Sequence, residues 1–160
     1  MALDITLILI LAATAATGIL AGASLDQSIK QLPARHRMGM AAFSTYSRAA
    51  DLGNGVVWYA IIGVSAAAFT IAAVVVARLQ GQAAGQAVPL DVAAALAVLH
   101  SLVTAQAAPT NFSQRRAVGD EAALERIFNR FERWQALRAV LQVLNFGALL
   151  WVLIGYTSAR

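Results

Sequence analysis

The sequence predicts an all-α fold, a transmembrane four-helix bundle in which an amphipathic cytoplasmic helix leads into the fourth span. Three observations predict it: an apolar composition, four long apolar windows and a one-sided distribution of positive charge. Of the 160 residues, 59% are hydrophobic and 12% are charged, whereas soluble domains carry about 25% charged residues. So few charges cannot cover a water-facing surface, which excludes a disordered protein, a nucleic-acid-binding module and most cytosolic enzymes. We expect residues 1–160 to form a single integral membrane domain.

Four windows are long and apolar enough to cross a bilayer, because a helix needs about 20 apolar residues to span a hydrocarbon core of about 30 Å. They lie at about residues 5–25, 56–77, 90–109 and 136–156. Buried strands end within about 4–8 residues, and backbone polar groups in lipid need partners within their own segment, so we expect helices. The first window could instead be a signal peptide cleaved near Ala23, but it follows Asp4 rather than a positively charged region, which favours a retained span.

The connections between the spans differ in character. Residues 26–55 are expected to break at Pro33, to hold a short interfacial helix and to end in a turn at residues 51–55. Residues 81–86 are typical of an external turn, and Pro89 favours a helix start after it. After Gly119, apolar residues recur at helical spacing, which predicts an amphipathic helix that continues into the fourth span. These apolar residues are Leu124, Ile127, Phe128 and Phe131.

Positive charge predicts the orientation. Of the 12 Lys and Arg residues, ten lie in the first and third connections or just inside the fourth span, and the other two are Arg78 and Arg160. Because cytoplasmic loops carry an excess of Lys and Arg, we expect both long connections in the cytoplasm and both termini outside it. Size and composition favour a multi-pass protein of the cell inner membrane. The net charge of +4 then indicates contact with anionic membrane lipids and no nucleic-acid partner.

Polar residues inside the spans are the candidate functional residues, because a central charge costs about 2.5–3.5 kcal/mol on insertion and such side chains usually face the bundle interior. Helical spacing places them in three stripes: Thr14, Gly18, Gly22 and Asp26; His100, Thr104 and Asn111; Arg138, Gln142 and Asn145. Matching depths puts His100 and Asn145 near the midplane. We therefore predict an ion pair between Asp26 and Arg138 at the cytoplasmic edge, with Asn111 as a neighbour.

Each of these residues also has a structural interpretation. Gly18 and Gly22 form a small-residue motif whose usual role is close helix packing. Arg138 could extend to the headgroups, and a structural polar cluster of Asp26, Thr104, Gln142 and Asn145 could only hold helices together. His100 is either a satisfied core histidine or a proton-handling group, because imidazole titrates near neutrality.

The sequence favours no metal and no cofactor. The chain has no cysteine and two histidines, His36 in a connection and His100 in a span, which is too few for a zinc or di-iron site. Phosphate-binding loops, dinucleotide fingerprints and catalytic serine motifs are absent from the sequence.

The chain resembles the anthrone-oxygenase-like family of small four-span membrane proteins. The resemblance lies in three segments: residues 18–22 with Leu32-Pro33-Ala34, Thr104 with Pro109-Thr110-Asn111, and Phe128, Phe131, Trp134 and Arg138. Gln135 and residues 26–28 depart from the family pattern. The resemblance implies cofactor-independent oxygenation of a polycyclic phenol by O₂, with an apolar aromatic ligand in an intramembrane cavity. In that chemistry His100 is the candidate catalytic base, and Arg138 and Asn111 are candidates to stabilise the oxyanion.

The alternative is a non-catalytic structural or accessory subunit of a larger membrane complex or of a homo-oligomer. The small residues of the first three spans and the lack of a sharp catalytic constellation favour it. A small transporter is a weaker alternative, because Asp26 lies at the end of a span. A cavity lined by His100, Asn145 and aromatic residues would favour ligand chemistry, whereas a solidly packed core would favour the subunit.

Overall fold

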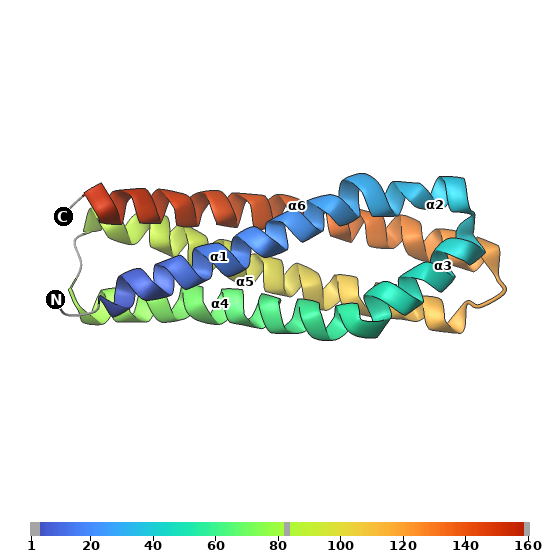
Figure 1. Ribbon diagram of the computed structural model, residues 1–160, viewed down its shortest axis with the longest axis horizontal. Helices are drawn as coiled ribbons and strands as arrows, with labels where there is room; N and C mark the ends of the chain where they lie inside the picture. The colour runs from blue at the N-terminus through green and yellow to red at the C-terminus, as the bar shows by residue number, and fades with distance from the viewer. Residues whose placement is uncertain (1–3, 82–83, 159–160) are drawn as a thin grey trace.

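Four long helical arms run up and down in a bundle (Figure 1). The computed structural model describes residues 4–81 and 84–158. In chain order the elements are α1 (Ile5–Asp26), the π-helix η1 (Gln27–Gln31), α2 (Leu32–Met38), α3 (Met40–Ala49), the π-helix η2 (Ala50–Asn54), α4 (Gly55–Leu79), α5 (Ala84–Phe112), the 3₁₀-helix η3 (Ser113–Arg116) and α6 (Glu121–Ser158). Each arm contains a stretch long and apolar enough to cross a membrane. The predicted all-α four-helix bundle is confirmed, and the chain is a small multi-pass membrane protein.

Both chain ends lie at one end of the bundle, and the α2–α3 turn and the α5–α6 connection lie at the other (Figure 1). We call this second end the basic end, because the two long connections there carry nine Lys and Arg residues: Lys30, Arg35, Arg37, Arg48, Arg115, Arg116, Arg126, Arg130 and Arg133. At the opposite end Arg78 forms an ion pair with Asp91, and Arg160 lies outside the described residues.

The inner face of α1 follows an alternating spacing of three and four residues. Its members are Thr6, Ile10, Ala13, Thr17, Leu20, Ser24 and, in η1, Gln27, all of them buried. This spacing is the one that packs helices nearly parallel along a seam. Asp4 begins the helix by accepting hydrogen bonds from the backbone N–H groups of Thr6 (3.0 Å) and Leu7 (3.2 Å). The Tyr156 hydroxyl donates to the same carboxylate at 2.6 Å and so joins the two chain ends.

Two predictions about the first connection are wrong. The chain stays helical through Pro33, because proline lies in the first turn of α2 and the preceding π-helix bonds the Leu32 N–H to the Gln27 carbonyl five residues back. The turn falls at Gly39, whose φ of 82° favours glycine. The second expected turn, at residues 51–55, is a kink at Gly53 inside η2, after which the chain continues directly into α4.

The later connections agree better with the sequence. The helix α6 begins just after Gly119 and continues without a break through the fourth span, as predicted. The third arm begins at Ala84, so Pro89 lies inside α5 rather than at its start. The predicted apolar face of α6 is buried in a core at the basic end, where Phe128 meets Phe43 edge to face with ring centroids 4.9 Å apart.

The two glycines of the small-residue motif have different surroundings. A Cβ atom at Gly18 would lie 2.9 Å from Cε2 of Phe146 on α6, so this position accepts only a very small residue. Gly22 is exposed and a Cβ there would meet nothing within 4 Å. The expectation that Gly22 packs against another helix is therefore wrong within this chain, because the inward seam of α1 passes through Leu20 and Ser24 instead.

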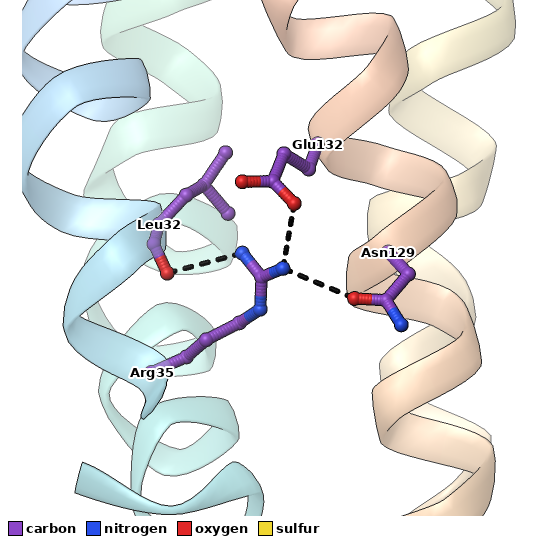
Figure 2. A network of polar contacts seen from close by, with 4 residues as sticks. All are labelled: Leu32, Arg35, Asn129 and Glu132. Atoms are coloured by element: carbon purple, nitrogen blue, oxygen red, sulfur yellow. Dashed lines mark hydrogen bonds and ion pairs between the residues drawn. The ribbon is translucent and has the colours of Figure 1, made fainter. Parts of the chain in front are cut away.

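Arg35, which the sequence analysis counted only among the positive charges of the first connection, joins α2 to α6 (Figure 2). Only 2% of the Arg35 side chain is exposed. One terminal nitrogen donates to the Leu32 carbonyl at 3.1 Å, and the other donates to Oδ1 of Asn129 at 3.0 Å and Oε2 of Glu132 at 2.6 Å. Because Glu132 is 43% exposed, this ion pair keeps one partner solvated, which lowers the desolvation cost of the pair.

We expect Arg35→Ala to lower the thermal stability of the protein in detergent, by about 2 kcal/mol, since hydrogen bonds to charged groups contribute about 1.5–3 kcal/mol. Thermal unfolding followed by circular dichroism measures the change. Arg37→Ala, an exposed arginine two residues along α2, is the control and should leave the melting temperature almost unchanged. Equal effects of the two substitutions would contradict a bracing role for Arg35.

Candidate functional site

A cavity of about 590 Å³ lies inside the half of the bundle nearer the basic end. Residues of α4 and α5 form its walls, and residues of α1, η1 and α6 form its floor. The α4 wall is built from small side chains, among them Ala60, Gly63, Ala67 and Ala68. The cavity arises here because these residues leave space that larger side chains would fill.

The cavity opens between α4 and α5. Two of its α4 residues, Val64 and Ile71, are also 69% and 47% exposed. On the α5 side the lining residues Ser101 and Phe112 are exposed as well. These residues belong to apolar spans or to their ends, so in a bilayer the opening faces the acyl chains rather than water.

The three predicted catalytic residues line this one cavity: His100, Asn111 and Arg138. Thr104 of the predicted polar cluster lines it too. Asp26, Gln142 and Asn145 lie outside its lining. The remaining lining residues are mostly apolar, with Tyr59, Phe112 and Phe131 as aromatic members. The arrangement is typical of ligand pockets, which are apolar with a few convergent polar groups.

His100 joins three helices through one hydrogen-bond network. Its Nε2 lies 2.8 Å from Nε2 of Gln142 on α6 and 3.2 Å from Oγ1 of Thr104. Oε1 of Gln142 accepts a hydrogen bond from the Ser24 hydroxyl of α1. An amide nitrogen can only donate, so with the amide assigned this way Nε2 accepts and the neutral ring carries its proton on Nδ1.

The predicted ion pair between Asp26 and Arg138 is wrong. Asp26 bonds instead to Lys30 and Gln31 of η1, both at 2.5 Å. The physical reason is the direction of the helix face: Ser24 and Gln27 take the inward positions of this segment, so Asp26 points away from α6. Arg138 donates to Oε1 of Gln135 at 3.0 Å.

Asn111 belongs to a second polar network, between α5 and α3. It does not lie beside an ion pair of Asp26 and Arg138, because that pair does not form. Its Oδ1 accepts from Nε2 of Gln114 at 2.7 Å. Gln114 also bonds to Ser44 (3.1 Å) and Ser47 (3.2 Å), and the Ser47 hydroxyl donates to Asp51 at 2.8 Å. Asp51 lines the cavity, so this network reaches the cavity at both Asn111 and Asp51.

Asn145 is buried on the inner face of α6, and its Oδ1 has no hydrogen-bond partner among the described residues. It does not line the cavity, so it does not share the candidate site with His100.

Sequence reasoning missed five polar residues that the structure places in or beside the site: Ser24, Gln27, Asp51, Tyr59 and Gln135. One signal could have found the first of them. Thr17 and Ser24 are seven residues apart, and Gln27 follows at a spacing of three, which matches the buried seam better than the stripe through Gly18 and Gly22. Asp51 had no such signal, because residues 51–55 are typical of a turn.

Among residues 4–81 and 84–158, no group of three His, Cys, Asp or Glu side chains is arranged to hold a metal ion. Comparisons with known protein families, with curated proteins and with solved structures found no match for this chain. The fold and the cavity thus define a class, a small four-span membrane protein with a cavity that opens between α4 and α5. The anthrone-oxygenase-like family stays a prediction from the sequence motifs.

Proposed function

We propose that the cavity binds a polycyclic phenol from the membrane and promotes its oxygenation by O₂ without a cofactor. One observation carries the proposal: His100, Asn111 and Arg138 line a single, otherwise apolar cavity with aromatic residues in its wall. A ligand cavity of this kind favours ligand chemistry over a purely structural subunit. Its volume of about 590 Å³ lies within the range of about 300–1,000 Å³ that holds a drug-sized ligand.

The proposed chemistry assigns one role to each polar residue. His100 takes a proton from the substrate at Nε2, after the substrate hydroxyl has replaced the Gln142 amide as the donor to this nitrogen. Arg138 and Asn111 stabilise the negative oxygen of the resulting anion. For an anthrone, the electron-rich anion reduces O₂: one oxygen atom becomes the carbonyl oxygen of the quinone, and the other leaves as water with the two hydrogens of the oxidised CH₂ group. Substrate and O₂ both partition into the apolar surroundings of the cavity.

We expect His100→Ala to lower the rate of anthrone oxidation by about 100-fold or more, because a positioned general base contributes about 10²–10⁴-fold. Oxygen uptake by the purified protein in lipid nanodiscs measures the rate, and circular dichroism checks that the variant is folded. His36→Ala, an exposed histidine on α2, is the matched control.

Unchanged turnover in His100→Ala would remove His100 from the mechanism. Wild-type protein that consumes no O₂ with anthrone would contradict oxygenation itself. If other polypeptides also accompany the protein when it is purified from native membranes, the accessory-subunit alternative gains support.

We also propose that the protein lies in the cell inner membrane with its basic end in the cytoplasm and both termini outside. Nine Lys and Arg residues in the connections at the basic end support this orientation. A reagent that reaches only the outer end of the bundle in intact cells can test this orientation.

Because the chain has no cysteine, single cysteines can report this orientation. Leu79→Cys and Val118→Cys place a thiol at opposite ends, at positions 82% and 60% exposed. We expect a membrane-impermeant maleimide to label Leu79→Cys in intact cells and to label Val118→Cys only after permeabilisation. The reverse pattern would invert the orientation.

A further inference from the structure

Arg138, on the α6 side of the cavity, is a cation without an acidic partner among the described residues. The described part of the chain places no carboxylate within ion-pair distance of it. Asp26 is paired with Lys30, and Asp51, the acid that shares the cavity, accepts its hydrogen bond from Ser47. The unpaired positive charge of the guanidinium therefore favours the binding of an anion beside it.

The guanidinium also keeps unused hydrogen-bond donors. Among the described residues its one hydrogen bond goes to Gln135, and its Nε, buried as an atom, has no partner. A guanidinium has five N–H donors, arranged to match an anionic oxygen pair. Arg138 is half-buried, and a cation in mostly apolar surroundings is costly unless it is paired, so a bound anion would lower a cost that the protein alone bears.

We infer that the ligand of this cavity is a flat aromatic acid whose anionic oxygen pairs with Arg138 while its apolar rings lie along the small residues of α4. The inference rests on the proposed function and narrows its substrate class to a phenol that also carries an acid group: the ionised acid group pairs with Arg138, whose remaining N–H donors stabilise, with Asn111, the oxygen that His100 deprotonates. The ligand reaches the cavity from the bilayer, through the opening bordered by Val64 and Ile71 of α4 and Ser101 of α5.

The test uses two probes of the same shape, anthracene-9-carboxylate and its uncharged methyl ester. Fluorescence titration of the purified full chain in phosphatidylcholine nanodiscs, which carry no net charge, measures both affinities. We expect the wild-type protein to bind the carboxylate more tightly than the ester. Arg138→Gln should weaken carboxylate binding by about 10- to 100-fold, the value of a charge-assisted hydrogen bond, and should change ester binding little.

Arg133→Gln is the matched control, since Arg133 is exposed on the same helix outside the cavity lining. Arg138→Lys keeps the charge and should keep the preference for the carboxylate. If Arg138→Gln fails to fold, the wild-type preference and the Arg138→Lys variant still decide. Equal affinity for both probes, or equal loss in Arg133→Gln, would overturn the inference.

Neither probe carries a phenol to oxidise, so the binding test is independent of the oxygenation test. Carboxylate binding through Arg138 without O₂ uptake on anthrone would contradict oxygenation and leave this inference standing.

Discussion

Ser24, Gln142 and His100 join three helices by side-chain hydrogen bonds, at a depth where lipid offers no other partner. Turned outward, each group would lose its hydrogen bonds, and an unsatisfied buried polar group costs about 1–3 kcal/mol. The network therefore fixes which faces of α1, α5 and α6 point inward. His100 is positioned beside the cavity by this same constraint, so the interaction that stabilises the bundle also prepares the site.

Two other regions, the cavity and the basic end, depend on these inward faces of the helices. Small residues on α4 leave space that His100, Asn111 and Arg138 face from α5 and α6. Beyond the spans, the aromatic core around Phe128 and the ion pair of Arg35 hold the α2–α3 hairpin against α6. The bundle thus continues past the apolar spans into the basic end, and the cavity lies in the half of the bundle next to this continuation.

The four spans and the long α6 helix could be predicted because hydrophobicity and helical spacing are properties of short segments. The inward face of α1 could not, because steps of exactly four residues drift around a helix of 3.6 residues per turn, so the stripe through Gly22 and Asp26 left the buried seam through Leu20, Ser24 and Gln27. The predicted Asp26–Arg138 pair failed for that reason. The cost of polar groups in lipid predicted that His100 and Arg138 face the bundle interior, where they line the cavity. Asp51 could not be predicted in this way, because its segment has the composition of a turn but forms a kinked helix.

The most direct test of this account asks whether the buried polar side chains avoid lipid. NMR spectra of ¹⁵N-labelled protein in nanodiscs that contain spin-labelled lipid would report the distance of each side-chain amide from the acyl chains. We expect the amide of Gln106, which is exposed on α5, to broaden strongly and that of Gln142, which is 1% exposed, to keep its signal. Equal broadening of the two, or a protein that stays in the aqueous fraction without detergent, would contradict a bundle built around an inward polar network.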